Sequence, residues 1–417
     1  MSIEDDVRKV GQQALQASRD LAMFSTKKKN VFLEAMADEL ESRKDQILEA
    51  NDKDVQAGRA EGLSAVLLDR LTLTDERFEA MIGGIQDVIG LKDHVGQKIS
   101  TWIRPNGLEI NKVRVPIGVI GIIYESRPNV TADAAVLCIK SSNTVILKGG
   151  KEALHSNRAI ATALQEGGEK KGLPANAIQL IKTTDRSAVT ALVRLNDYVD
   201  LVIPRGGEGL IHAVTVQATV PVIKHYKGVC HVYVDEFADL DMAVDIIENA
   251  KCQRPGVCNS METLLVNRSI APAFLPRIAE HLQAAGVELR GDEASLGLVP
   301  DMKEATEEDW SEEYLDLILS IAIVDDVKAA IEHINRYGSK HSDAIITKDE
   351  RAQKCFMQQV DASTVYVNAS TRFTDGNEFG LGAEMGISTD KLHARGPMGL
   401  EELTTYKYQV FGTGQIR

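Results

Sequence analysis

The stretch of this sequence best suited to chemistry is Arg254-Pro-Gly-Val-Cys258-Asn-Ser-Met-Glu-Thr263, which sets a thiol among turn-forming residues directly before an apolar strand. A substrate can reach a cysteine in a loop, and the thiolate becomes a strong nucleophile when a cation, backbone amides or a helix N-terminus stabilises it. Asn259 and Ser260 are placed to donate hydrogen bonds to an oxyanion. The competing interpretation is that Cys258 is a small buried apolar residue in a turn.

The other four cysteines carry weaker signals. Cys138 lies on the apolar face of a predicted helix, Cys230 begins a predicted buried strand, and Cys355 lies within a helix, so all three read as structural. Cys252, six residues before Cys258, stays an alternative nucleophile. An odd number of cysteines without a C-x-x-C pair suggests neither a disulfide framework nor a structural zinc site.

Two glycine-rich loops each follow a predicted strand and precede a helix. They are Lys148-Gly-Gly-Lys151 and Pro204-Arg-Gly206-Gly207-Glu-Gly209. Glycines at the carboxyl end of a parallel strand let backbone N–H groups approach a phosphate, and the following helix favours the anion. Neither loop matches G-x-G-x-x-G, and each read alone is equally an ordinary tight turn. The two lysines favour a phosphate-bearing ligand.

A third polar cluster runs from Asn368 to Gly380 after a predicted strand, and it contains Ser370 and Arg372. A guanidinium can bind a carboxylate or phosphate through two parallel hydrogen bonds. A surface ion pair is the alternative for Arg372. The lone His393 near the carboxyl end is more simply explained as structural.

Alternating short apolar runs and helix-length segments indicate an α/β fold with a mostly parallel sheet. The first fifty residues are predicted to be helical, with Phe32, Met36 and Leu40 on one face. The predicted strands of a first domain are 115–124, 144–148, 177–181, 201–203 and 220–223. A second α/β domain is expected beyond residue 228, with strands at 230–235, 263–266, 316–324, 343–347 and 364–368 and a helix at 327–337. Segments 107–115 and 404–411 read as exposed strands, which are candidates for contacts between subunits.

Composition narrows the class of protein. The 417 residues are enough for two or three domains, and 47 basic against 61 acidic residues give a net charge of −14. That charge opposes binding to nucleic acid or to an anionic membrane. No apolar run approaches the roughly 20 residues needed to span a bilayer, and the first residues do not read as a secretory signal, so we expect a cytoplasmic protein with a small-molecule substrate.

Taken in order, seven blocks of the sequence resemble the aldehyde dehydrogenase superfamily over nearly the whole chain. The blocks are VPIGVIGIIYESRPNVTADAA, TVILKGGKEA, IPRGGEGL, QRPGVCNSMETLLVN, HSDAIITKD, VYVNASTRFTDG and FGLGAEMGISTDKLHARGPMGLEELTTYK. The resemblance implies an aldehyde dehydrogenase-like fold: a Rossmann-like NADP-binding domain in residues 1–228, a catalytic domain in 229–368, and a return segment with an oligomerisation tail in 369–417. Residues 101–116 are expected to contribute to a small β flap in a homo-oligomer.

The resemblance also assigns roles to individual residues. Cys258 becomes the expected nucleophile, with its backbone N–H and Asn259 as oxyanion donors, and Lys148 falls where the family's lysine meets the adenosine ribose. Three residues later many NAD-using relatives carry a glutamate that would repel a 2′-phosphate, whereas this chain has Lys151, so NADP is the expected cofactor. Gly206 and Gly207 are expected to bind it as well. Glu313 matches the glutamate that holds the nicotinamide ribose, although Leu315 replaces the family's usual phenylalanine.

One departure from the family points to the reaction. Hydrolytic members carry a general-base glutamate where this chain reads Ile223-Lys-His-Tyr-Lys-Gly-Val229, without a carboxylate. A thioester that water does not attack can exchange with phosphate instead. The resemblance is nearest to members that reduce L-glutamyl 5-phosphate to glutamate 5-semialdehyde, the second step of proline biosynthesis from glutamate. A reductase that uses acyl-CoA and a catalytically silent scaffold are the alternatives.

Loop position and charge suggest where the substrate binds. Arg127 and Arg372, with Asn129 and Ser370 in the same loops, are the candidates for holding the substrate's phosphate or α-carboxylate. Ser126 and Asn129 are the alternatives for the family's oxyanion asparagine. A glutamate kinase, which would supply the labile acyl phosphate, is the expected protein partner. No metal site is expected.

Overall fold

The chain forms two compact units, and the computed structural model describes residues 2–224 and 226–417. The first unit runs to Lys224 and adds Gly380–Gly386 and Met398–Arg417, while the second runs on to Phe379 and adds Ile387–Pro397. The break lies close to the predicted boundary at 228. The predicted separate tail, 369–417, differs from the structure, because its residues are divided between the two units.

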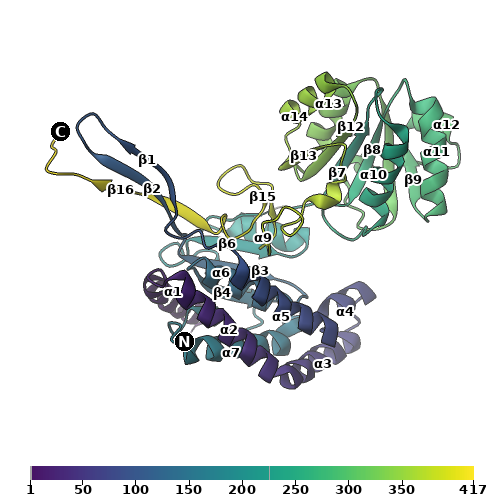
Figure 1. Cartoon of the computed structure of the whole chain (residues 1–417). Coiled ribbons are helices and arrows are strands. Elements are labelled where there is room, and N and C mark those ends of the chain that lie inside the picture. The colour runs from purple at the N-terminus through teal and green to yellow at the C-terminus, as the bar shows by residue number, and fades with distance from the viewer. Residues whose placement is uncertain (1, 225) are drawn as a thin grey trace. The chain divides into compact units, whose positions relative to one another are not determined.

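The first unit has a helical layer in front of its sheet (Figure 1). Its helices are α1 (Ile3–Leu21), α2 (Thr26–Ser42), α3 (Lys44–Ala60), α4 (Ala65–Leu71), α5 (Asp75–Gly90), α6 (Asn129–Lys140), α7 (Leu154–Lys170), α8 (Ser187–Leu192) and α9 (Glu208–Gln217), with a 3-10 turn η1 (Lys151–Ala153). Ser2, Ser25, Ser64 and Thr74 each accept a hydrogen bond from a backbone N–H of the first turn that follows, which is why α1, α2, α4 and α5 begin where they do.

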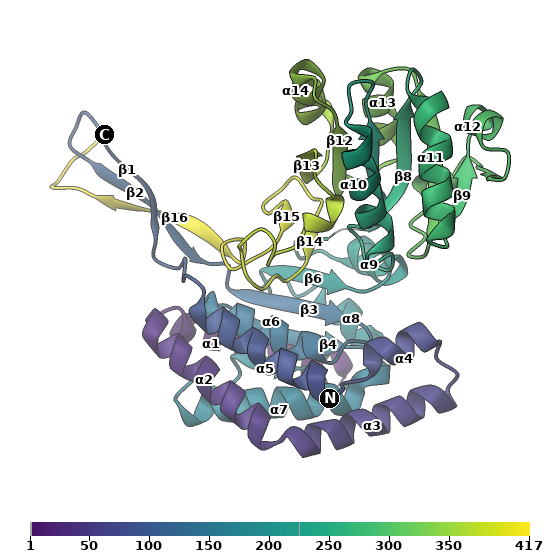
Figure 2. The same ribbon diagram turned by 45° about the vertical axis from the view of Figure 1, so that its right-hand side comes forward.

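The first unit's parallel sheet has the strand order β5-β4-β3-β6, formed by β3 (Val119–Tyr124), β4 (Thr144–Gly149), β5 (Ile178–Leu180) and β6 (Leu201–Arg205). Every residue of β3 is buried, as expected for a parallel strand covered on both faces (Figure 2). The chain first adds β4 and β5 on one side of β3 and then adds β6 on the other side. Ligands of open α/β sheets bind at the carboxyl ends of the strands at such a point.

A three-stranded antiparallel ribbon also belongs to this unit and extends away from its helices (Figure 1). It consists of β1 (Lys98–Ile103), β2 (Glu109–Pro116) and β16 (Thr404–Phe411), with β2 in the middle. All six residues of β1 are exposed. The ribbon therefore buries little within the single chain.

The second unit contains a seven-stranded parallel sheet with the order β10-β9-β11-β8-β7-β12-β13. Its strands are β7 (Cys230–Val234), β8 (Met261–Asn267), β9 (Glu288–Gly291), β10 (Lys303–Glu304), β11 (Ile318–Val324), β12 (Ser342–Ile346) and β13 (Thr364–Val367). A separate antiparallel pair joins β14 (Ile387–Ser388) to β15 (Gly396–Pro397).

Helices cover both faces of this second sheet. They are α10 (Leu240–Cys252), α11 (Ala271–Ala284), α12 (Glu293–Leu298), α13 (Val327–Tyr337) and α14 (Glu350–Gln359), with 3-10 turns η2 (Glu308–Ser311) and η3 (Thr371–Phe373). Alternate strand residues point to opposite faces: Val232 packs in the core beneath α10 and α11, whereas Tyr233 packs in the core beneath α13 and α14. The prediction of an α/β fold with mostly parallel sheets is confirmed.

One predicted strand does not form. Residues 220–223 make only an isolated bridge, in which Val222 pairs with Val202 of β6. Pro221 has no N–H to donate, so the pairing cannot extend through it. Within the described residues, none of the helices is long and apolar enough to cross a membrane.

Candidate active site

Cys258 lies on the loop between α10 and β8, residues 253–260, which we call the cysteine loop. The loop precedes β8 and so sits at the amino edge of the sheet of the second unit. Ser260 N–H donates to Val257 O at 3.0 Å, and Ser260 Oγ donates to Ala250 O at 3.3 Å, which ties the loop back to α10. Cys258 itself is half-buried, the environment in which a thiol is both held and reachable.

Gly228 lies directly against the backbone of Cys258. A Cβ at residue 228 would be 1.9 Å from the Cys258 carbonyl oxygen, closer than any real contact. The buried Cys230 thiol lies 3.3 Å from that same oxygen and donates to it. Only glycine fits at residue 228. Because it has no Cβ, the segment that leads into β7 can pack directly against the Cys258 carbonyl group.

The side chain of Asn259 is fully used in holding the segment after β13. Its Nδ2 donates to Thr374 O at 3.0 Å and to Arg372 O at 3.3 Å, its Oδ1 accepts from the Arg372 guanidinium, and its backbone carbonyl accepts from Thr371 Oγ at 2.8 Å. This geometry differs from the expectation that the Asn259 amide donates to an oxyanion, because both amide hydrogens already have carbonyl partners.

Arg372 is a cation bound to Asn259, the residue next to the nucleophile. Besides Asn259 it donates from Nε to Gln253 Oε1 at 3.0 Å. Burial and the neighbouring Arg254 lower the pKa of Arg372, while the Cys258 thiol and Asp375 act in the opposite direction. Cys258 and Arg372 therefore interact electrostatically. Ser370 is buried, and its hydroxyl accepts from Arg372 N–H at 3.2 Å, so it caps the η3 turn.

The remaining thiols lie in less favourable surroundings. Burial raises the pKa of Cys138, Cys230 and Cys252, which keeps these thiols protonated at neutral pH. Cys252, the alternative nucleophile, also lies near the Glu248 carboxylate, which adds to the increase. Cys258 is favoured over Cys252 on these grounds.

Glu313 also lies at the amino edge of this sheet. Its Oε1 accepts the Gly228 N–H at 2.8 Å, so the residue that the family resemblance assigns to the nicotinamide ribose is joined through Gly228 to the Cys258 backbone. Leu315, two residues on, has φ of 54°, a left-handed conformation that is strained for a residue with a branched side chain.

The first unit presents two lysines at the carboxyl end of β4. Lys148 is buried, donates from Nζ to Gly149 O at 2.9 Å, and has its pKa lowered by burial. Lys151 is exposed and pairs with Glu61 at 2.8 Å, a hydrogen bond that raises its pKa. A Cβ on Gly149 would lie 2.1 Å from Asn157 Nδ2, so this turn needs glycine. A glycine-lined turn with two ammonium groups fits an anionic nucleotide.

The second glycine-rich loop is less open to phosphate. Gly207 N–H donates to the Glu125 carboxylate at 3.0 Å, and a Cβ on Gly206 would lie 2.4 Å from the same carboxylate. Glu125 thus occupies the amino end of α9, where a phosphate oxygen would otherwise bind. Gly206 and Gly207 lie at the predicted edge of the sheet, but the Glu125 carboxylate already binds the Gly207 N–H there.

Arg127 and Asn129 follow β3 at that edge. Arg127 is exposed, while Asn129 is half-buried and donates from Nδ2 to Asp133 Oδ2 at 2.8 Å. Burial raises the pKa of Asp133 to about 6, against the opposing effects of Asn129 and Arg205. Ser126 N–H and Oγ both donate to Glu152 of η1, at 2.6 and 3.0 Å, so Ser126 is tied to the turn that follows β4.

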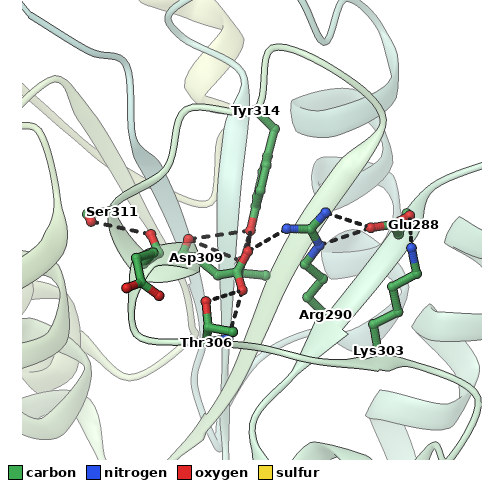
Figure 3. A network of polar contacts seen from close by, with 9 residues as sticks. Glu288, Arg290, Lys303, Thr306, Asp309, Ser311 and Tyr314 are labelled. Atoms are coloured by element: carbon green, nitrogen blue, oxygen red, sulfur yellow. Dashed lines mark hydrogen bonds and ion pairs between the residues drawn. The ribbon is translucent and has the colours of Figure 1, made fainter.

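The sequence analysis did not identify the buried charged residues that flank the cysteine loop. Lys251 Nζ and Glu262 Oε2 form a completely buried ion pair of 2.6 Å across the base of the cysteine loop. Asp309 organises a second cluster with Thr306, Tyr314 and Arg290 (Figure 3). A charged residue inside an otherwise apolar strand, as in Met261-Glu-Thr-Leu-Leu-Val-Asn267, was the available signal for Glu262.

Comparison with known proteins supports the family. The aldehyde dehydrogenase family model matches residues 2–305. A γ-glutamyl phosphate reductase from Moorella thermoacetica is 56% identical over 417 residues, all of both chains. One from Clostridium beijerinckii is 56% identical over 407 residues, 98% of each chain. The crystal structure of γ-glutamyl phosphate reductase from Thermotoga maritima has 50% identity, a TM-score of 0.97 and 99% coverage of both chains.

These likenesses confirm the resemblance and the fold expected from the sequence, and the family implies a nicotinamide cofactor. They extend over both units rather than over one motif, since the crystal structure and this chain match almost end to end. The chain belongs to the aldehyde dehydrogenase family of oxidoreductases, within its group of γ-glutamyl phosphate reductases.

Proposed function

We propose that this chain reduces L-glutamyl 5-phosphate to L-glutamate 5-semialdehyde and phosphate with NADPH, through a thioester on Cys258, as the second step of proline biosynthesis from glutamate. The observation that carries the proposal is the half-buried Cys258, whose neighbour Asn259 binds the Arg372 guanidinium, in a chain half identical, from end to end, to a γ-glutamyl phosphate reductase of known structure.

The chemistry begins at the thiol. The Cys258 thiolate attacks the acyl carbon, and the bond from that carbon to the phosphate oxygen breaks, so that phosphate leaves and a thioester remains. The reduced nicotinamide supplies a hydride for the acyl carbon when it is bound. The resulting oxyanion on the Cys258 thiohemiacetal collapses, the carbon–sulfur bond breaks, and the aldehyde leaves as the thiolate returns.

Backbone rather than side-chain donors are proposed to stabilise the oxyanion. The Asn259 amide is committed to Arg372 and Thr374, so we assign it to positioning the segment after β13 and give the oxyanion to the N–H of Cys258. Close packing of Gly228 against the Cys258 Cα and carbonyl group fixes the backbone next to that N–H before any substrate arrives. Preorganised donors of this kind contribute about 3 to 4 kcal/mol to transition-state stabilisation.

Arg372 is the proposed anchor for the substrate's phosphate or α-carboxylate in the second unit, with Ser370 holding its backbone. Arg127 and Asn129 are the proposed anchors in the first unit, where Arg127 is exposed. A guanidinium suits either anion because it offers two parallel N–H donors.

NADP is proposed as the cofactor because Lys151 is an exposed cation three residues beyond the buried Lys148. Gly206, Gly207 and Glu313 complete the proposed cofactor site. Replacing Lys151 with glutamate puts a negative charge where the 2′-phosphate is expected and should shift the ratio of kcat/KM for NADP over NAD toward NAD by at least about tenfold. An unchanged ratio would remove Lys151 from the site.

A homo-oligomer, a cytoplasmic location and a glutamate kinase partner accompany this proposal. The exposed apolar side chains of the ribbon support self-association, and NADPH and an unstable acyl phosphate are both supplied in the cytoplasm. The kinase is proposed only because its product is the labile substrate.

The decisive experiment runs the reaction backwards, with pyrroline carboxylate as the source of the semialdehyde, NADP and inorganic phosphate, and follows NADPH absorbance. Turnover should require phosphate and should fall at least about a thousandfold in Cys258→Ala, while Cys252→Ala retains it. Phosphate-independent turnover would indicate a hydrolytic enzyme. Turnover that depends on CoA and ignores phosphate would indicate the CoA-linked alternative.

A further inference from the structure

The cysteine loop is closed at its base by charges that no solvent reaches. Lys251 is the last residue but one of α10 and Glu262 is the second residue of β8, so the pair flanks the loop on both sides, and both side chains are 0% exposed. Burial raises the pKa of Glu262 and lowers that of Lys251, which means that the pair is costly to charge inside the protein. Apolar residues can often replace a buried ion pair without loss of stability, so joining α10 to β8 does not by itself require these two charges. The other contacts of Glu262 suggest a further role.

The second carboxylate oxygen of Glu262 reaches a different segment. Glu262 Oε1 accepts the Leu315 N–H at 3.4 Å, while Oε2 lies 2.6 Å from Lys251. Leu315 is the residue with the strained left-handed backbone, and strained conformations persist only where surrounding contacts fix them. Lys251 also lies 5.9 Å from the centroid of the Tyr314 ring.

The same segment is held from its other side by the Asp309 cluster (Figure 3). Tyr314 OH donates to Asp309 at 2.7 Å and is 2.7 Å from Ser320 Oγ, and Arg290 donates to Asp309 at 2.6 Å. Burial opposes the ionisation of Asp309, but hydrogen bonds from Thr306, Tyr314 and Arg290 outweigh it and lower its pKa to about 2. Tyr314 is therefore fixed by an ionised carboxylate.

Three consecutive residues are thus anchored to different parts of the second unit: Glu313 to Gly228, Tyr314 to Asp309 and Leu315 to Glu262. Because Gly228 packs on Cys258 and Glu262 closes the cysteine loop, the contacts form a closed circuit. We propose that Glu262 is a positioning residue: its Oε1, as acceptor of the Leu315 N–H, holds the 313–315 segment against the cysteine loop, while Lys251 balances the buried charge on Oε2. The proposal deepens the function above, since Glu313 matters there as a cofactor residue.

Two double variants separate this role from simple stability. K251M/E262Q removes both buried charges but keeps a carbonyl oxygen for the Leu315 N–H, whereas K251M/E262M has nearly the same volume and keeps none. We expect K251M/E262Q to stay within about threefold of wild type in kcat/KM, and K251M/E262M to lose at least about tenfold, chiefly through a raised KM for the nucleotide.

Labelling of Cys258 by iodoacetamide gives a readout that does not depend on the substrate. Protection by the oxidised nucleotide should persist in K251M/E262Q and weaken in K251M/E262M. Labelling and protection in wild type, measured first, show whether the proposed nucleotide site exists, so failure of the proposed function is distinguishable from failure of this inference. A matched control is K29M/D93N, which removes the buried 2.6 Å pair Lys29–Asp93 of the other unit and should lower Tm without changing protection.

Equal kcat/KM and equal protection in the two variants would overturn the proposal and leave the pair a structural brace. Equal losses in both would overturn it as well, because the charge and not the acceptor would then be required. Should K251M/E262M fail to fold, hydrogen exchange in wild type decides: the Leu315 amide should exchange slowly, and exchange at the rate of an open loop would refute the hydrogen bond to Glu262.

Discussion

At residue 228 there is room for a hydrogen atom and nothing larger. The Cys258 carbonyl carbon and oxygen, together with its Cα, lie within 2.5 Å of where a Cβ would be. These are backbone atoms, which cannot rotate away as the end of a flexible side chain can. The nucleophile's peptide group therefore has its position set by a residue thirty places earlier in the chain, an arrangement that pattern analysis of the cysteine loop alone does not suggest.

Gly228→Ala should therefore displace the cysteine loop. We expect kcat to fall at least about a hundredfold, with a smaller effect on KM, because oxyanion donors act only when correctly placed. Steady-state kinetics and the rate of Cys258 alkylation measure the effect. Gly256→Ala is the matched control in the same loop, since a Cβ there meets only the Leu315 carbonyl oxygen, at an ordinary 3.7 Å. Comparable losses in both variants would contradict the argument.

Asp133 is a residue whose charge works against folding. Its pKa rises from the ordinary 3.8 to about 6 in the folded state because of burial, so the folded chain binds this proton more tightly than the unfolded chain does. The contribution of the Asp133 proton to the free energy of unfolding is fully present below pH 3.8, and it is lost as the pH rises through 6.

Asp133→Asn should consequently stabilise the protein at pH 7 to 8, by about 1 to 3 kcal/mol, because the amide has no charge to bury and its oxygen can still accept from Asn129. The gain should vanish near pH 3, where Asp133 is protonated in both states. Thermal unfolding of the two proteins at both pH values measures it. A Tm difference that is the same at both pH values would show that the charge is not its cause.

What the sequence could predict at this scale depended on whether the signal was local. Cys258 stood out because a thiol among turn residues before an apolar run is recognisable within ten residues. The true partners of Asn259 come from beyond residue 370, and nothing in its neighbourhood distinguishes an amide that faces substrate from one that faces two carbonyls. Glu262 and Lys251 were missed for the same reason: their pairing appears only when α10 and β8 are side by side.

At the scale of elements, α7 shows how a helix beside a ligand loop can be fixed from a distance. Its own N-cap residue, Ala153, makes no side-chain hydrogen bond. Asp54 of α3 does so instead: its carboxylate accepts from His155 N–H at 3.1 Å and from both Ser156 N–H at 2.7 Å and Ser156 Oγ at 2.6 Å. The proposed cofactor turn at 148–151 leads directly into this capped helix.

Asp54→Ala should therefore lower the free energy of unfolding by about 1 to 3 kcal/mol, since it leaves buried N–H donors at the start of α7 without an acceptor. Denaturant unfolding measures the change. Asp54→Asn keeps one acceptor oxygen and should lose less than the alanine variant. Equal losses would mean that the cap contributes nothing beyond the volume of the side chain.

The elements themselves followed from periodicity where it was strong. The predicted helix 327–337 and the predicted strand 404–411 coincide with α13 and β16. The predicted strand 220–223 was wrong, since an apolar run with a proline at its second position reads as a strand but can make only one bridge. The run 115–124 was read as one element, yet β2 ends at Pro116 and β3 begins at Val119, with Gly118 at φ of 134° between them.

At the scale of the whole molecule, the three-stranded ribbon is the feature that most favours association of subunits. Its outer strands expose Trp102, Ile103, Tyr408, Val410 and Phe411, with Phe411 57% accessible. Trp102 and Tyr408 meet edge to face with ring centroids 6.1 Å apart, which gathers the apolar surface onto one part of the ribbon. A patch of this kind, at the edge of a small sheet, is typical of a contact between subunits.

Replacing Tyr408 and Val410 together with lysine should convert the proposed oligomer to monomer, because each substitution would place a charge in an apolar contact. Tm at very low protein concentration should change little, since both side chains are exposed in the single chain. Light scattering after size-exclusion chromatography measures the mass. Met23→Lys, at an exposed apolar residue of the same unit, is the matched control and should leave the mass unchanged.

The sequence did not reveal how the two units share the end of the chain. Residues 380–386 and 398–417 belong to the first unit and 387–397 to the second, yet no change of composition marks either crossing. Linkers that are recognisable from sequence are polar and flexible, whereas these crossings lie within Gly-rich turns and short paired strands. Domain boundaries of this kind are set by contacts that only the folded chain makes.

The position of β16 has a consequence for how the protein is made. β2 pairs early with β1, its neighbour in the chain, but its other edge waits for β16, and the hydrogen-bonded residues Arg114 and Thr404 are 290 residues apart. During synthesis that edge of β2 stays open until residues 404–411 have been made. A chain that ends prematurely keeps it open permanently, as an unpaired strand edge that promotes aggregation. Completion of the ribbon therefore distinguishes a chain that contains β16 from one truncated before residue 404.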